Sequence, residues 1–78
     1  MNEFAKLYNL GSGNQVLIDS LIDEEYNIFQ IVCKTFVNNK ENKMIITYQT
    51  LQHLKLGLDG FTLNWAIDYY NAVKNINP

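Results

Sequence analysis

The chain has 78 residues, which is enough for one small hydrophobic core but not for two, so we expect a single domain spanning residues 1–78. The hydrophobic fraction of 47% and the charged fraction of 18% are typical of a folded domain and exclude a disordered chain. Six lysines, no arginine and eight acidic residues give a net charge of −2. This acidic balance disfavours nucleic acid as a ligand, because affinity for nucleic acid depends on Lys and Arg side chains that neutralise phosphates.

Two features of the sequence indicate a cytoplasmic protein without a membrane partner. No apolar run approaches the ~20 residues that span a bilayer, and the N-terminus lacks the basic and then apolar pattern of a secretory signal. The single cysteine, Cys33, excludes an internal disulfide and suits a reducing compartment. Eleven asparagines and the absence of arginine further suggest an AT-rich coding source, such as a phage or plasmid of a low-GC bacterium.

The first third of the chain contains candidate helix starts. Residues 1–10 form a short amphipathic segment with the spacing of two helical turns, and the Gly-rich residues 11–14 predict a turn. Ser12 is followed three residues later by Gln, as in a capping box, so we expect a helix from there to Leu21. Asp23–Glu25 suit the first turn of another helix, because carboxylates are stabilised by the N-terminal end of the helix dipole.

The segment Tyr26–Val37 fits two interpretations. Four of its apolar side chains have helical spacing, namely Phe29, Val32, Cys33 and Phe36. The acidic start and the length also favour a helix, and a helix is our prediction. The many β-branched and aromatic residues favour a strand instead. In that alternative, residues 38–43 form a loop, Met44–Thr50 is the partner strand, and the C-terminal helix packs on a β-hairpin over residues 26–50 of an α+β fold.

A C-terminal helix with two apolar rows is predicted between the breakers Asp59-Gly60 and Asn77-Pro78. The first row has the spacing of a core-facing stripe and consists of Leu63, Ala66, Ile67, Tyr70 and Val73. The second row, which we call the Trp65 row, lies nearly opposite and consists of Trp65, Tyr69, Ala72 and Ile76. One helix cannot turn both rows into the core of a two-layer domain. The Trp65 row is therefore packed against the N-terminal segment, used in a homodimer, or exposed as a contact surface for another molecule.

The pattern in Leu56–Asp59, Thr62–Leu63 and Ala66–Ile67 is similar to the middle of a helix-turn-helix. In that family a glycine follows the first helix because the chain needs a positive φ there, and Gly57 stands at this position. The chain departs from the family at His53, where a small residue is usual. The resemblance, which extends to winged-helix proteins without their wing, implies a mostly α domain with a helix-turn-helix-like C-terminal half. This is our predicted fold class, with the α+β hairpin fold as the alternative.

Few residues in the sequence have the spacing that catalysis or metal binding requires. His53 is the only histidine, and no second His or cysteine pair stands at metal-ligand spacing. Cys33 lies in the most apolar stretch, which indicates an inert core thiol rather than a nucleophile. We therefore expect a protein that is not an enzyme, with no catalytic residues, no metal site and no cofactor.

Binding is the function that remains, and we expect protein binding. The predicted contact surface is the aromatic face of the last helix, with Trp65, Tyr69, Ile76 and Asp68, because aromatic side chains dominate protein interfaces. The partner is a larger protein that the chain inhibits or adapts, or a second copy in a homodimer. The alternative is a DNA-binding regulator of a mobile element, which would use Asn64 and Asn71 to read bases and Lys43, Lys55 and Lys74 to contact phosphates.

Overall fold

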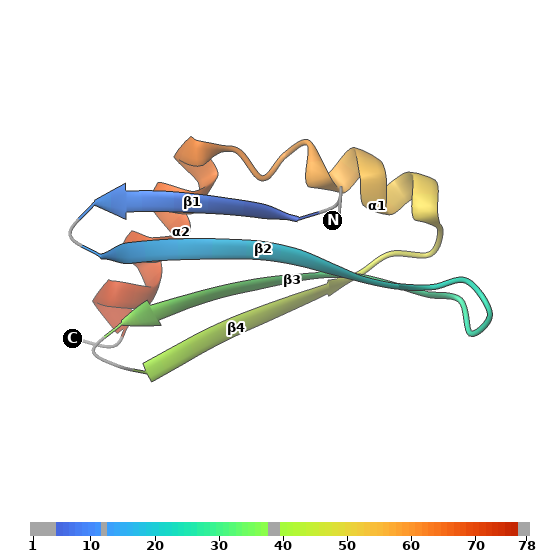
Figure 1. Cartoon of the computed structure of the whole chain (residues 1–78), viewed down its shortest axis with the longest axis horizontal. Coiled ribbons are helices and arrows are strands. Elements are labelled where there is room, and N and C mark those ends of the chain that lie inside the picture. Colours follow the sequence, from blue (N-terminus) through green and yellow to red (C-terminus); the bar gives the residue numbers. More distant parts are fainter. Residues whose placement is uncertain (1–4, 12, 38–39, 77–78) are drawn as a thin grey trace.

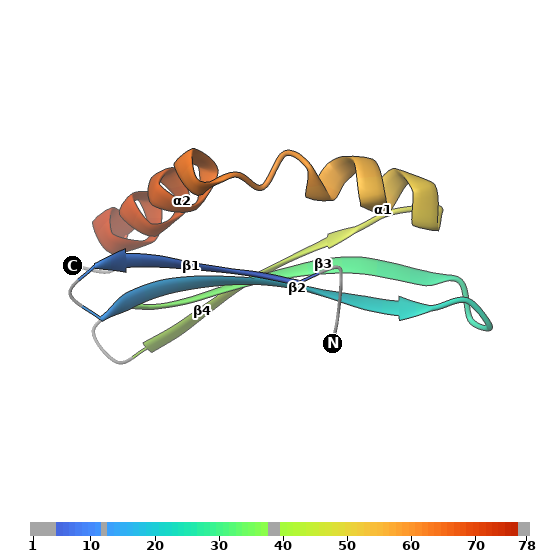
Figure 2. The ribbon, with the colours of Figure 1, turned by 45° about the horizontal axis from the view of Figure 1, so that its top comes forward.

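The computed structural model describes residues 5–11, 13–37 and 40–76, and it shows a four-stranded sheet followed by two helices. The strands are β1 (Lys6–Gly11), β2 (Asn14–Asp23), β3 (Ile28–Val37) and β4 (Lys40–Thr47). Each strand pairs antiparallel with its neighbour in the sequence, so the order in the sheet is β1-β2-β3-β4 (Figure 1). The helices α1 (Leu51–Leu58) and α2 (Leu63–Ile76) both lie on one face of this sheet, and no described element covers the other face (Figure 2).

The prediction of a mostly helical domain is wrong, and β3 shows the physical reason. Along β3, side chains alternate between a buried position and a more exposed one, which is the period of a strand. Both kinds of position carry apolar residues in this segment, so helical spacing arose by coincidence, and the β-branched and aromatic composition was the better guide. The α+β alternative has the right class, since β3 and β4 form a hairpin beneath the helices, but it lacked β1 and β2.

The predicted helix from the capping box to Leu21 is also wrong. This part of the chain is β2, whose Val16 and Ile18 side chains are fully buried against the helices. The turn before it is confirmed at Gly11 and Gly13, which have φ values of 85° and 79° that only glycine adopts without strain. Residues 1–4 and Ser12, which entered the sequence prediction, lie outside the described residues.

Asp23 makes the hydrogen bonds of a helix cap but begins a turn instead of a helix. Its carboxylate Oδ1 accepts from the backbone N–H groups of Glu25 (3.1 Å) and Tyr26 (3.3 Å). The chain then reverses at Asn27, which has a φ of 54° in the left-handed region that asparagine tolerates better than most residues. The same acidic cluster that predicted a helix therefore builds the turn between β2 and β3.

The helices and the sheet share one hydrophobic core. Its centre consists of fully buried side chains from β2, β3, α1 and α2, namely Val16, Ile18, Ile31, Cys33, Leu54 and Ala66. Thr35 is the one buried polar side chain of the described residues, and its hydroxyl donates to the carbonyl oxygen of Gln15 (2.8 Å) on the neighbouring strand. A single core that spans both layers makes the fold α+β, and α1 and α2 depend on the sheet for their packing.

The helix-turn-helix-like description of the C-terminal half is corrected by the sheet-rich structure. The two helices follow one another along the sheet and both pack on it (Figure 2). Gly57, which the family pattern assigned to a positive φ, is inside α1, and the positive-φ glycines of the described chain are Gly11 and Gly13. A Cβ atom on Gly57 would lie 2.6 Å from Cζ of Tyr48. The Tyr48 ring packs directly against the helix backbone at Gly57, so any side chain at this position would force the ring to move.

This contact predicts the effect of Gly57→Ala on stability. Alanine is favoured over glycine inside a helix by about 1 kcal/mol. Overlap with the Tyr48 ring reverses this gain, and we expect a net loss of about 1 to 3 kcal/mol in the free energy of unfolding. Urea denaturation measures it. In a Tyr48→Leu background, where the overlapping ring atoms are absent, the same substitution is expected to be neutral or stabilising. An equal loss in both backgrounds would contradict the proposed cause.

Candidate functional site

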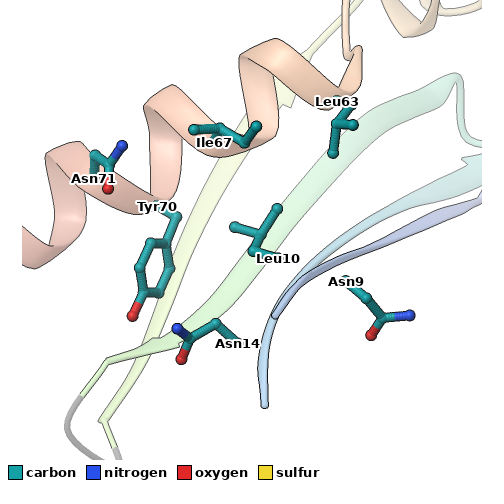
Figure 3. Close-up of a pocket in the computed structure, with 7 residues that line it drawn as sticks. All are labelled: Asn9, Leu10, Asn14, Leu63, Ile67, Tyr70 and Asn71. Atoms are coloured by element: carbon teal, nitrogen blue, oxygen red, sulfur yellow. The ribbon is translucent and has the colours of Figure 1, made fainter. Parts of the chain in front are cut away.

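A hollow of about 370 Å³ lies between α2 and the β1–β2 hairpin (Figure 3). We call it the α2 hollow. Its lining comes from residues far apart in the sequence: Asn9 and Leu10 of β1, Asn14 of β2, and Leu63, Ile67, Tyr70 and Asn71 of α2. Its volume is near the lower end of the range for ligand sites, so it has room for one or two large side chains or for a small ligand.

The way α2 sits on the sheet creates the hollow. The helix contacts the sheet along a line through Ala66, which is fully buried, and Val73, which is 9% exposed. Because Ala66 is small, the helix backbone lies close to the sheet and the larger side chains spread to both sides. On the hollow side, Leu63 and Ile67 remain 49% and 39% exposed. They were predicted to face the core, and in the structure they form one wall of the α2 hollow.

The rim of the hollow is polar but carries no charge. Two carboxamides, Asn14 and Asn71, line it together with Tyr70, and none of the lining residues is charged. Each carboxamide offers both donors and an acceptor, which is the hydrogen-bonding pattern of a peptide group. Asn9 contributes to the lining from the strand, but its side chain points away from α2, and its oxygen accepts from Nε2 of Gln15 (2.7 Å) on the other face of the sheet (Figure 3). An uncharged amide rim around apolar walls suits a neutral, peptide-like ligand.

Long-range hydrogen bonds hold the start of α2 against β1. The Lys6 ammonium donates to the backbone oxygens of Leu58 (2.9 Å) and Phe61 (3.3 Å), and the Tyr8 hydroxyl also donates to Phe61 (2.8 Å). A cation at the end of α1 is favourable because the carbonyl end of a helix carries partial negative charge. Thr62 then caps α2, since its hydroxyl accepts from the backbone N–H of Trp65 (3.2 Å). These contacts set the position of the helix that forms the hollow.

The aromatic residues predicted to bind a partner lie on the other side of α2 and contact the core. Trp65 stacks on Tyr69 with ring centroids 5.1 Å apart and forms a T-shaped pair with Phe61, with ring centroids 4.6 Å apart. Both Trp65 and Tyr69 are half-buried, and the Tyr69 hydroxyl donates to the backbone oxygen of Cys33 (3.4 Å). Part of this aromatic stack therefore stabilises the packing of α2 on the sheet, and only the outer part of the stack is exposed to solvent.

The other two residues of the predicted protein contact are exposed. Ile76, in the last turn of α2, is 76% exposed. Asp68 is exposed near the middle of the helix. Neither lines the α2 hollow. The structure thus separates the predicted contact residues into a half-buried aromatic pair and two exposed positions.

The residues predicted for DNA binding are spread over both faces of the molecule. Asn64 and Asn71 are exposed on α2, and Asn71 lines the α2 hollow. Lys55 and Lys74 lie in the last turns of α1 and α2. Lys43 is on β4 and lines a hollow on the sheet face that the helices leave uncovered. The three lysines therefore do not form one basic surface.

The ionisable groups of the core are buried by apolar neighbours. Burial raises the pKa of the Cys33 thiol to about 11, and burial followed by the nearby Cys33 raises the pKa of Tyr69. His53 is exposed in the first turn of α1, where its backbone N–H donates to the Thr50 hydroxyl. Within residues 5–11, 13–37 and 40–76, no group of three His, Cys, Asp or Glu side chains is placed to hold a metal ion.

Comparison of the chain with protein-family models, curated proteins and solved structures gave no match. In the part of the chain that the structure describes, neither helix has the length and apolar character needed to cross a membrane.

Sequence reasoning missed the strand side of the hollow. Asn9, Leu10 and Asn14 were assigned to an amphipathic segment and a turn, with no role in binding. A usable signal was present, because Leu10 belongs to an alternating strand pattern with Tyr8 that places both side chains under the helices. The contact between β1 and α2 could not be foreseen while the segment was taken as helical.

The buried thiol predicts a specific pH dependence of stability. The unfolded chain loses the Cys33 proton near its ordinary pKa of 9.0, whereas the folded chain keeps it up to about pH 11. The free energy of unfolding is therefore expected to be unaffected by this group below pH 9 and to fall between pH 9 and 11. Chemical denaturation across this range measures the slope.

Cys33→Ala supplies the control for this prediction. It loses packing at every pH but removes the thiol, so its stability is expected to fall less steeply above pH 9 than that of the wild type. The part of the Tyr69 pKa shift that comes from Cys33 is removed with the thiol, whereas the part that comes from burial is common to both proteins. A thiol reagent at pH 8 is expected to label Cys33 only on unfolding. Parallel slopes for the two proteins, or rapid labelling of the folded chain, would show that the thiol is accessible.

Proposed function

We propose that the protein is a non-enzymatic protein-binding module, an inhibitor or adaptor that receives an apolar side chain of a larger protein in the α2 hollow. The observation that carries the proposal is the combination of exposed Leu63 and Ile67 with an uncharged rim of carboxamides. Large apolar side chains that converge on a hollow are typical of the centre of a protein interface, where an anchor side chain is buried. The carboxamides can pair with the backbone groups on either side of such an anchor.

Protein binding is better supported than DNA binding. The net charge is −2, and the lysines at positions 43, 55 and 74 do not form one basic surface. Counterion release, which supplies most of the affinity for DNA, needs several cations along one face. A reducing compartment such as the cytoplasm fits this proposal, because Cys33 is a free buried thiol. A source in an AT-rich phage or plasmid remains a proposal from composition.

The test uses a displayed library of random peptides, because the partner is not identified. Peptides selected on the wild-type protein are expected to share one large apolar residue flanked by small or polar residues. On peptide addition, NMR spectra of the labelled protein are expected to show shifts of the backbone amide signals of Asn9, Asn14 and Asn71 and of the side-chain amide signals of Asn14 and Asn71. Ile67→Glu places a charge in the wall and is expected to weaken binding about tenfold or more, which corresponds to about 1.4 kcal/mol.

Ile76→Glu is the matched control, because it makes the same change on the same helix at an exposed position outside the hollow. It is expected to leave peptide affinity unchanged. An equal loss of peptide affinity in both variants, or amide shifts confined to Trp65 and Tyr69, would show that the peptide binds outside the hollow. A labelled DNA duplex at low salt serves as the competing ligand, and salt-sensitive binding that Lys55→Ala and Lys74→Ala remove would favour the DNA alternative.

A further inference from the structure

The sheet face opposite the helices carries an unusual amount of apolar surface. Strand alternation turns every second side chain toward this face, which we call the bare sheet face. Four of its large apolar side chains are more than half exposed: Leu7 (54%), Leu21 (51%), Phe36 (60%) and Ile45 (51%). Leu17 and Val32 lie among them and are partly buried by these neighbours. A contiguous apolar surface of this kind on a small domain marks an interaction site.

We propose that the bare sheet face binds the same face of a second copy, giving a two-fold dimer with the sheets inside and the helices outside. The size of the face fits this occupant. Four strands of six to ten residues, spaced by about 4.8 Å with a rise of about 3.3 Å per residue, cover roughly 550 Å² in projection. Two such faces bury about 1,100 Å² when each is treated as flat, without the additional area of protruding side chains. This is close to the lower limit of about 1,200 Å² for specific interfaces.

Shape complementarity requires a protrusion and a hollow on the same face, because a two-fold interface pairs each surface with itself. Phe36 of β3 protrudes at one end of the face. On its β1 and β2 side lies a mostly apolar hollow of about 300 Å³, lined by Leu7, Gln15, Leu17, Lys34 and Phe36 itself. A two-fold axis that runs along the strands between β2 and β3 exchanges these sides. It inserts Phe36 of each copy into the hollow of the other copy.

The charged residues of the face are also distributed so that the same axis brings opposite charges together. The half formed by β1 and β2 carries Asp19 and Asp23, and the half formed by β3 and β4 carries Lys34, Lys43 and Glu41. The proposed axis lays the acidic half of one copy over the more basic half of the other, with the partner copy's Asp19 above Val32 and two residues along β3 from Lys34. A polyanion would meet the acids as well as the lysines, which disfavours nucleic acid on this face.

The first experiment is sedimentation equilibrium of the full chain over a concentration series. The wild type is expected to reach twice the 9.1 kDa mass of one chain. Phe36→Lys is expected to raise the dimer dissociation constant about tenfold or more. Leu56→Lys is the matched control, since Leu56 is an equally exposed apolar residue (64%) on the helix side, and it is expected to leave the dimer intact. Circular dichroism verifies that both variants fold.

Charge reversal tests the orientation of the two copies. Asp19→Lys and Lys34→Glu are each expected to weaken self-association, because each places like charges across the interface. An equimolar mixture of the two variants is expected to associate more tightly than either alone, since the reversed charges then face each other.

A wild-type chain that stays monomeric at every concentration would overturn the proposal and leave the face for a foreign partner. So would a dimer that Leu56→Lys weakens as much as Phe36→Lys does, or a mixture of charge variants that gains nothing. None of these results bears on the α2 hollow, which lies on the opposite side of the sheet.

Discussion

All helical cover in this structure lies on one face of one sheet, and this one-sided burial determines how the core and the exposed apolar surfaces are arranged. The central strands β2 and β3 are each ten residues long, whereas α1 has only eight residues. The helices must therefore follow one another along the sheet, rather than pack side by side, to bury Ile18 and Ile31 at its centre. The hydrogen bonds from Lys6 and Tyr8 to the segment that joins the helices hold this arrangement in place.

The same constraint distributes the apolar residues of α2. A helix that crosses a sheet can bury only a narrow line of side chains, and here the line passes through Ala66 and Val73. The two apolar rows of the helix flank that line. One flank carries the stacked Trp65 and Tyr69, which stabilise the seat of the helix. The other flank, with Leu63 and Ile67, extends past the sheet contact and stays available for a ligand.

Part of the structure could be predicted from the sequence, and the reasons for success and failure are physical. The C-terminal helix was predicted correctly, because a 14-residue amphipathic segment is a strong local signal, but of its core-facing row only Ala66 and Val73 are buried. The segment Tyr26–Val37 failed, because a strand with apolar residues on both faces loses the alternation that would distinguish it from a helix. The glycine at position 57 was explained by a local backbone conformation. In the structure the reason for a glycine is the ring of Tyr48, a tertiary contact that a local sequence pattern does not contain. The hollow itself depends on β1 meeting α2, so no local pattern could reveal it.

The connection between the first strand and the last helix also links binding to the completion of folding. In this sheet every strand pairs with its neighbour in the sequence, so the hairpins can form from contacts between nearby residues. The α2 hollow is different, because its lining runs from Asn9 to Asn71 and exists only when the two ends of the chain have met. A ligand held there binds the complete fold and not its partly folded forms. By mass action such a ligand stabilises the whole protein, because it binds the folded chain and not the unfolded one. A partner bound in the hollow would therefore raise the free energy of unfolding of the protein.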